Sequence, residues 1–263
     1  MSIVRIGAVS YLNARPLVVG LESRPDRFAV RYDLPSTCAR LLHAHEIDLG
    51  LIPSIEYLRG EGYAIVPDCA VASDGPVASV ALFTKVPIER VQSIALDTSS
   101  RTSVTLLRVL CHHRFGISPE FVDHGPDLAA MAATYDAGLL IGDPAFDADH
   151  TALGLRKIDL GEEWTTMTGL PFIYAAWTGR PGAVTADEIV ALQAAGATGV
   201  GSPDLIAAEY GAGDAARTAR AAAYLRDNVR YALGPDEAAG LQLFLNYAAE
   251  LGLAPRRRVL EFF

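Results

Sequence analysis

Short apolar runs alternate with segments of helical periodicity along the first part of the chain. Several of the runs are rich in β-branched residues and end at polar or turn-forming residues, as is typical of buried strands. The predicted strands are IVRIGAV (3–9), FAVRYDL (28–34), DLGLIP (48–53) and VASVALFT (77–84). Helices are predicted at 14–23, at 36–45 and from Ser54 onward. This alternation is typical of βαβ units, which build a mostly parallel sheet.

The same alternation returns in the middle of the chain and stops after residue 179. The predicted strands here are VQSIALD (91–97), PEFVDH (119–124), AGLLIGD (137–143) and PFIYAAWT (171–178). Helices are predicted between them at 102–115 and 126–134. Beyond residue 179 the periodicity is helical, in the segments 186–197, 203–210, 214–231 and 235–251. The pattern therefore predicts an α/β protein with a helical C-terminal part.

No repeat or low-complexity linker separates the two series of strands. The extended segments near 80–88 and 172–180 are expected to cross from one lobe to another. We predict a first α/β lobe from residues 1–84 plus 180–263 and a second from residues 85–179, with a ligand cleft between them. This is the two-lobed plan of solute-binding proteins, whose ligand lies between hinged lobes.

Composition and charge narrow the classes of function. The chain has 263 residues, 51% of them apolar, and a net charge of −9, which argues against a nucleic-acid partner. No run of about 20 apolar residues occurs, so we expect no membrane-spanning helix. Cys38, Cys69 and Cys111 lie far apart without C-x-x-C spacing, which argues against a disulfide framework. No secretory signal pattern opens the chain, so we expect a cytoplasmic protein; the sequence does not indicate its oligomeric state.

The sequence motifs do not indicate a metal site, a nucleotide-binding site or acyl-transfer catalysis. His112 and His113 are adjacent and His43 and His45 lie two residues apart, so neither pair shares one helix face. The patterns G-x-G-x-x-G, G-x-x-x-x-G-K-[ST] and G-x-S-x-G do not occur. We therefore expect neither a metal ion nor a cofactor.

Three polar clusters lie where predicted strands end and helices begin, the position at which open α/β sheets bind ligands. The clusters are Ser10-Tyr11-Leu12-Asn13, the segment DTSSRTS (97–103) and Gly142-Asp143. The hydroxyls and backbone N–H groups of the second cluster suit a carboxylate or phosphate at a helix N-terminus. Asn13, Ser99, Ser100 and Asp143 are alternatively simple helix N-caps, for which these residue types are preferred. The equivalent placement of all three clusters favours a shared ligand site.

Four motifs together resemble the menaquinone-biosynthesis family whose enzyme is the chorismate dehydratase of the futalosine pathway. They are VSYLNARPL (9–17), DLGLIPSIEYL (48–58), DTSSRTSVTLLRVL (97–110) and LLIGDPAF (139–146). The resemblance implies a two-lobed fold like that of type II periplasmic binding proteins, used here by a cytoplasmic enzyme. It implies that chorismate loses water to give 3-[(1-carboxyvinyl)oxy]benzoate, with no cofactor.

The resemblance also implies roles for individual side chains. Chorismate is a small dianion, and one of its carboxylates suits the hydroxyls and amides at the start of the helix after residue 100. The residues expected to bind substrate are Ser10, Tyr11, Ser54, Ser79, Ser99, Ser100, Thr102, Ser103 and Gly142. Asn13 is expected to point into the cleft toward the reacting ring. The proton is removed either by Asp143 or by the enolpyruvyl carboxylate of the substrate itself.

Two other interpretations share the fold but not the chemistry. The first is a non-catalytic binding module of the cytoplasm that only captures a small organic anion, because fold alone does not specify function. The second is the sister family that cyclises dehypoxanthine futalosine by radical chemistry. That family is disfavoured because the three cysteines lack the spacing of an iron–sulfur site.

Overall fold

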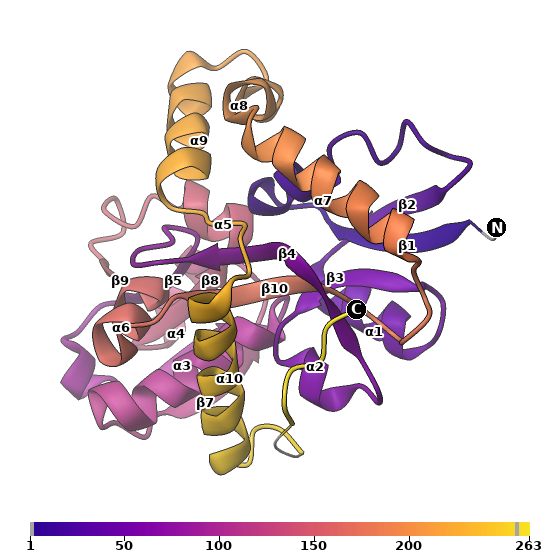
Figure 1. Ribbon diagram of the computed structural model, residues 1–263. Coiled ribbons are helices and arrows are strands. Elements are labelled where there is room, and N and C mark those ends of the chain that lie inside the picture. Colours follow the sequence, from indigo (N-terminus) through magenta and orange to yellow (C-terminus); the bar gives the residue numbers. More distant parts are fainter. Residues whose placement is uncertain (1–2, 256–257) are drawn as a thin grey trace.

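The computed structural model describes residues 3–255 and 258–263, and its strands form two five-stranded sheets (Figure 1). The first sheet has the order β2-β1-β3-β10-β4. Its strands are β1 (Val4–Val9), β2 (Phe28–Asp33), β3 (Leu49–Pro53), β4 (Ala64–Ser73) and β10 (Phe172–Gly179). Strand β1 pairs in parallel with β2 and β3, whereas β10 runs antiparallel between β3 and β4.

The second sheet has the same arrangement of parallel and antiparallel neighbours, in the order β7-β6-β8-β5-β9. Its strands are β5 (Val80–Thr84), β6 (Ser93–Asp97), β7 (Glu120–His124), β8 (Ala137–Ile141) and β9 (Arg156–Asp159). Strand β6 is parallel to β7 and β8, and β5 is antiparallel to β8 and β9. Each lobe therefore contains a mixed sheet with one antiparallel strand. The chain enters that strand directly after leaving the other lobe.

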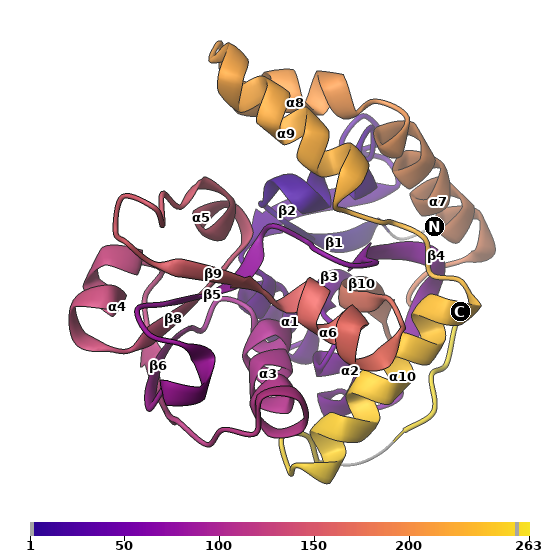
Figure 2. The same ribbon diagram turned by 90° about the vertical axis from the view of Figure 1, so that its left-hand side faces the viewer.

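Helices cover both sheets (Figure 2). In the first lobe they are η1 (Leu12–Val18), α1 (Pro35–His43), α2 (Glu56–Arg59), α7 (Ala186–Val200), α8 (Pro203–Gly211), α9 (Ala215–Asp227) and α10 (Pro235–Glu250). In the second they are η2 (Ile88–Arg90), α3 (Arg101–Leu110), η3 (Cys111–Phe115), α4 (Leu128–Thr134), α5 (Gly142–Asp147) and α6 (Leu160–Thr168). Within the described residues, no helix has the length and apolar composition needed to cross a membrane.

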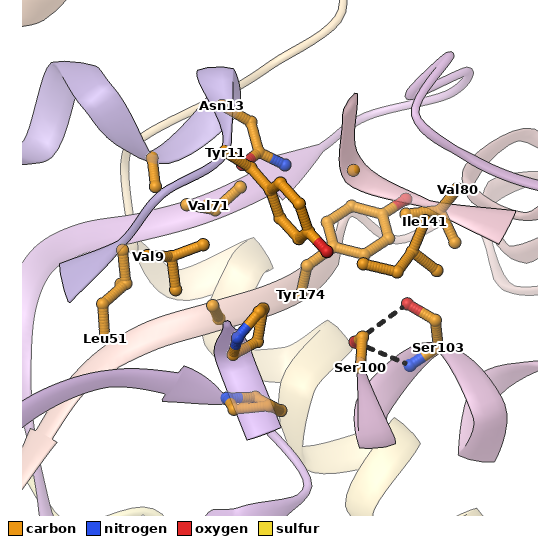
Figure 3. Close-up of a pocket in the computed structure, with 15 residues that line it drawn as sticks. Val9, Tyr11, Asn13, Leu51, Val71, Val80, Ser100, Ser103, Ile141 and Tyr174 are labelled. Carbon is orange, nitrogen blue, oxygen red and sulfur yellow. Dashed lines mark hydrogen bonds between the residues drawn. The ribbon is translucent and has the colours of Figure 1, made fainter. Parts of the chain in front are cut away.

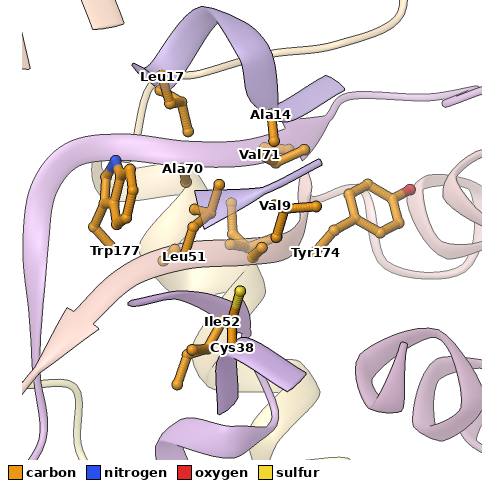
Figure 4. Packing of buried hydrophobic residues seen from close by; sticks show 14 of the residues in the cluster. Val9, Ala14, Leu17, Cys38, Leu51, Ile52, Ala70, Val71, Tyr174 and Trp177 are labelled. Atoms are coloured by element: carbon orange, nitrogen blue, oxygen red, sulfur yellow. The ribbon is translucent and has the colours of Figure 1, made fainter. Parts of the chain in front are cut away.

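The apolar core is continuous from the first sheet into its covering helices. Successive residues Leu51 and Ile52 of β3 point to opposite faces, as the period of two in a strand requires. Figure 4 shows Leu17 of η1 above the sheet and Cys38 of α1 below it. On β10, the ring of Phe172 packs 4.9 Å from that of Phe244, so α10 is fastened to the strand that returns from the second lobe.

The lobe boundaries differ from the predicted ones. Strand β5, placed by the sequence in the first lobe (1–84 plus 180–263), pairs with β8 and β9 of the second sheet. Strand β10, placed in the second lobe (85–179), pairs with β3 and β4 of the first sheet. The chain thus crosses before each of these strands and not after it. Both strands are fully buried, and a fully buried strand carries no face pattern that tells which sheet it joins.

The predicted helix at 14–23 is also shorter and tighter than expected. Residues Leu12–Val18 form a 3-10 helix, with Pro16 inside it. Proline lacks the N–H that an α-helix would need at this position and disfavours the helical conformation of the residue before it. The segment therefore makes about two tight turns at the end of β1, and the first of them carries Asn13 toward the space between the lobes.

Candidate active site

A pocket lies between the two sheets and takes its walls from both lobes (Figure 3). It holds about 420 Å³ of space free of protein atoms, part of it open to solvent. The side chains that bring polar atoms to its wall are Tyr11, Asn13, Ser100, Ser103 and Tyr174. The remaining lining residues are Val9, Ala14, Pro35, Leu51, Pro53, Val71, Val80, Ile141, Gly142 and Ala175. A mostly apolar wall with a few convergent polar groups is typical of a small-molecule site.

Two serine hydroxyls at the start of α3 form the polar end of the pocket. Ser100 is the N-cap of α3, and its Oγ accepts a hydrogen bond from the backbone N–H of Ser103 at 3.4 Å. The two Oγ atoms are 3.1 Å apart, and both side chains are buried (Figure 3). The prediction that Ser100 caps a helix is confirmed. Because the positive end of the helix dipole lies at the same place, this end of the pocket suits an anionic group.

Tyr11 and Gly142 meet across the pocket. The Tyr11 hydroxyl donates to Oγ of Ser99 at 3.4 Å, and burial raises the pKa of Tyr11, so the phenol stays protonated at neutral pH. Gly142 has φ +62°, and a Cβ placed on it would lie 2.6 Å from the Tyr11 ring. Only glycine combines this conformation with this close approach. The ring of Tyr11, from the first lobe, therefore rests directly on the backbone of the second.

Asp143 joins the lobes by a different contact. Its Oδ1 accepts a hydrogen bond from the backbone N–H of Leu12 at 2.9 Å, although the two residues are 131 positions apart. Burial raises the pKa of Asp143, while this hydrogen bond and the charge of Arg15 oppose the shift. Asp143 makes no cap bond within α5, so the interpretation as a cap of its own helix is wrong. Its carboxylate instead accepts from a backbone N–H in the first turn of η1, in the opposite lobe.

Asn13 lies inside η1 and lines the pocket. The N-cap of η1 is Tyr11, and no side chain makes a cap hydrogen bond there. The interpretation of Asn13 as a helix cap is therefore wrong, because the helix begins before it. Its half-buried amide is left to face the space between the lobes.

The sequence model of the menaquinone biosynthesis family matches the chain over residues 4–250. This chain belongs to that family. A chorismate dehydratase from Thermus thermophilus is 34% identical over an alignment of 191 residues, and the match covers 66% of this chain and 69% of that protein. The resemblance noted from the four sequence motifs is thereby confirmed.

Solved structures with low sequence identity share the fold. Protein AF1704 from Archaeoglobus fulgidus has a TM-score of 0.77 and 19% identity, covering 95% of this chain and 98% of its own. The periplasmic aliphatic sulphonate binding protein SsuA from Escherichia coli has a TM-score of 0.68 and 20% identity, covering 98% and 95%. The predicted two-lobed fold of the periplasmic-binding-protein type is confirmed.

Two of the residues predicted to bind substrate make contacts between the lobes. Oγ1 of Thr102 lies 3.3 Å from Oγ of Ser54 and accepts from the backbone N–H of Ile55 at 3.2 Å. Oγ of Ser54 also donates to the carbonyl oxygen of Ile173 at 2.8 Å. Both side chains are buried in this contact between α3 and the end of β3, and neither is among the residues that line the pocket.

Three further predicted residues lie beside the pocket or away from it. Ser99 is the acceptor for Tyr11, and its carbonyl oxygen accepts from the N–H of Ser36 at 3.1 Å. Ser79 is buried, and its carbonyl oxygen accepts from the N–H of Gly142 at 2.8 Å. Ser10 is exposed and faces an outer groove instead of the pocket. Of the predicted residues, the structure brings Tyr11, Asn13, Ser100, Ser103 and Gly142 together in the pocket wall.

Tyr174 is a lining residue that the sequence did not reveal. It lies in β10, and its hydroxyl is 3.0 Å from Oγ of Ser73. The apolar run around Tyr174 predicts a buried strand, in which an aromatic residue is usually part of the core. Nothing in that run marks the Tyr174 hydroxyl as a group that faces a pocket. Among the described residues, no group of three or more His, Cys, Asp or Glu side chains is arranged to hold a metal ion.

Proposed function

We propose that the protein is a chorismate dehydratase, which removes water from chorismate to give 3-[(1-carboxyvinyl)oxy]benzoate for menaquinone synthesis by the futalosine pathway. The observation that carries the proposal is the pocket itself. It joins Asn13 of the S-Y-L-N motif to Ser100 and Ser103 of the S-S-R-T-S motif, in a chain of the menaquinone biosynthesis family. The identity to the Thermus thermophilus chorismate dehydratase supports the same reaction.

In this proposal the two ends of the pocket have different tasks. One carboxylate of chorismate binds the hydroxyls of Ser100 and Ser103 at the start of α3, where the helix dipole favours negative charge. The ring lies against the apolar wall, beside Asn13. The C3 proton and the C4 hydroxyl then leave, and the ring becomes aromatic. Aromatisation makes the elimination thermodynamically favourable. Positioning of the substrate and assisted proton transfer supply the rate enhancement.

For the base we favour the enolpyruvyl carboxylate of chorismate over Asp143. Asp143 is not among the lining residues, and its Oδ1 is already occupied by the Leu12 N–H. An intramolecular carboxylate is held near the reacting carbon at high effective concentration once the substrate is bound. Asn13 would then orient that carboxylate or the departing hydroxyl by hydrogen bonds.

The direct test is incubation of the purified protein with chorismate, followed by mass spectrometry. We expect chorismate to be replaced by a product lighter by one water molecule, with the ultraviolet spectrum of a substituted benzoate. The similarity to the sulphonate binding protein SsuA favours the rival function, capture of an organic anion without chemistry. In that case chorismate or another anion would bind and be recovered unchanged.

Loss of the two pocket hydroxyls should weaken substrate binding. The double variant Ser100→Ala/Ser103→Ala removes both hydroxyls, of which one donates to the other, so one hydrogen bond to the charged substrate is lost, at about 1.5–3 kcal/mol of binding. We expect KM to rise roughly 10- to 100-fold, as that free energy implies. Steady-state kinetics measure the effect, and Ser23→Ala, whose hydroxyl only bonds the carbonyl of Gly20, serves as the control. An unchanged KM would remove these serines from the binding site.

Replacing Asp143 by asparagine distinguishes the two candidate bases. The amide oxygen of Asp143→Asn can still accept from the Leu12 N–H, so the contact between lobes is preserved. Because burial raises the pKa of Asp143, its charged form is disfavoured there, and the neutral variant should fold at least as stably. We expect turnover within a few-fold of wild type. A loss of ~100-fold or more would instead assign the proton transfer to Asp143.

We also propose that the enzyme works in the cytoplasm. Cys38, Cys69 and Cys111 are all free and buried, and burial raises the pKa of each thiol. Three unpaired thiols suit a reducing compartment. A fluorescent fusion or cell fractionation in the source organism would test this assignment.

A further inference from the structure

The hairpin formed by α8 and α9 of the first lobe rests on α5 of the second lobe (Figure 1). Its contacts centre on Asp147, the last residue of α5. The carboxylate of Asp147 accepts from the hydroxyl of Tyr210 and from the guanidinium of Arg217, each at 2.9 Å, and also pairs with Arg220. Three donors of one lobe therefore converge on a single acceptor of the other.

Aromatic rings hold the two guanidinium groups of this cluster in place. The guanidinium of Arg217 lies 4.3 Å from the centre of the Tyr210 ring, and that of Arg220 lies 4.8 Å from the centre of the Phe146 ring. The Phe146 ring in turn packs 4.7 Å from the ring of Tyr224 in α9. A guanidinium stacked on a ring loses less conformational freedom when it binds a carboxylate. The hairpin is therefore pre-organised for the contact with α5.

The ion pairs of this cluster are exposed to water. The side chains of Asp147, Arg217 and Arg220 are 32%, 40% and 53% exposed. A pair this exposed changes an equilibrium by at most about fivefold, and dissolved salt weakens it. The other ionic contact between the lobes, at Glu56, has a fully buried carboxylate. The contact at α5 is therefore the one that breaks and re-forms more readily.

Helix α5 connects this exposed cluster to the wall of the pocket. The helix has six residues, so its two ends are only about 8 Å apart. At its start, Asp143 accepts from the N–H of Leu12, and Gly142 lies against the Tyr11 ring. At its end, Asp147 binds the hairpin. A helix this short moves as one piece, so release of its end also separates its start from the first lobe.

We propose that Asp147 and the three side chains that it binds form a salt-sensitive latch, which holds α5 against the first lobe and sets how often the pocket opens on this side. While the latch is closed, α5 keeps its contacts with η1 and encloses whatever the pocket holds. Contacts that close over a site and reopen commonly set the rate at which a ligand enters or leaves. The inference does not rest on the proposed reaction, because it concerns access to the pocket.

Hydrogen–deuterium exchange of the ligand-free protein, followed by nuclear magnetic resonance, tests the latch. The N–H of Leu12 donates across the lobes to Asp143, so its exchange reports the opening. We expect Asp147→Ala to accelerate this exchange about tenfold, because two exposed ion pairs are lost together. The matched control is Asp204→Ala, which removes an equally exposed type of pair, with Arg226, inside the hairpin. It should leave the Leu12 exchange rate unchanged.

An amide inside the first lobe separates opening from general loosening. The N–H of Ala70 donates to the carbonyl oxygen of Tyr231 at 3.0 Å, and both residues belong to the first lobe. Its exchange should be the same in wild type and in Asp147→Ala. Equal acceleration of the Ala70 and Leu12 amides, or an unchanged Leu12 amide in Asp147→Ala, overturns the inference.

Salt gives a second readout on the same amide. Raising the ionic strength from about 0.1 M to about 1 M shortens the screening length from about 10 Å to about 3 Å. The Leu12 amide of wild type should then exchange several-fold faster, whereas that of Asp147→Ala should respond no more than the Ala70 amide. An equal response to salt in both proteins overturns the ionic latch. A protein that shows the expected exchange but leaves chorismate unchanged keeps the latch and loses the proposed function.

Discussion

Replacing Asn13 by aspartate is expected to lower the turnover of chorismate at least ~100-fold while the protein folds normally, since this is the lower range for loss of a proton-transfer or positioning group. Asn13 lines the pocket and makes no cap hydrogen bond, so its substitution disturbs neither the core nor the start of η1. A carboxylate in its place cannot donate a hydrogen bond. It also sets a negative charge against an anionic substrate.

The control for this prediction is the same charge change outside the pocket. Oδ1 of Asn246 in α10 accepts from Gln242 at 3.3 Å, and the carboxylate of Asn246→Asp can accept in the same way. Turnover and thermal unfolding of both variants should be measured side by side. We expect both to melt near the wild-type temperature and only Asn13→Asp to lose turnover. If Asn13→Asp turned over chorismate at the wild-type rate, the amide would have no part in the reaction.

The sequence predicts the strands of this fold well and their partners poorly. Segments such as 48–53 and 137–143 are short apolar runs between polar boundaries, and both are strands in the structure. The exchange of β5 and β10 between the sheets was not predicted, because every residue of both strands is buried. Which sheet a fully buried strand joins depends on pairing with distant segments, and this leaves no local signature.

The candidate site was predicted in part, and side-chain direction explains the difference. Ser100 and Ser103 are three residues apart and share one face of the first turn of α3, so both reach the pocket. Thr102 lies in the same turn but faces the end of β3, where it bonds the Ile55 N–H. A motif places a cluster at a helix start, but the angle of the helix decides which members face a ligand.

Tyr174 could not be found from the sequence because its place in the pocket wall depends on contacts across the fold. Tyr174 lies in an apolar strand, where an aromatic residue is usually part of the core. Polar atoms on such residues gain a role only from partners that the folded chain supplies.

A buried ion cluster at Glu56 is expected to stabilise the contact between the lobes. Glu56 is fully buried and bonds His43 at 2.7 Å, Arg59 at 2.5 Å and Arg101 at 3.1 Å. Arg101 begins α3 in the second lobe, whereas Glu56 begins α2 in the first. Burial alone raises the pKa of Glu56, but the hydrogen bond from His43 and the charges of Arg59 and Arg101 outweigh it. The net pKa is therefore lowered.

Glu56→Ala should lower the free energy of unfolding by about 3 kcal/mol, the lower end for removal of one partner from a buried pair. The lower end applies because the side chains of His43, Arg59 and Arg101 are 29–41% exposed, so water can solvate them once the carboxylate is gone. Urea titration at pH 7 measures the loss. The matched control is Glu163→Ala, which breaks a half-exposed pair with Arg114 and should cost at most about 1 kcal/mol.

The pH dependence gives an independent check on the same cluster. Because the folded pKa of Glu56 is lowered, its contribution is complete above the unfolded value of about 4.3 and is lost as pH falls through the folded pKa. The contribution of Glu56 ionisation to the stability difference between wild type and Glu56→Ala should therefore be complete from pH 7 down to about pH 5. It should shrink in more acidic solution, where wild-type Glu56 becomes protonated. A difference that is the same at pH 3 and pH 7, or below about 0.5 kcal/mol at pH 7, would mean that the ionised carboxylate does not hold α3 against the first lobe.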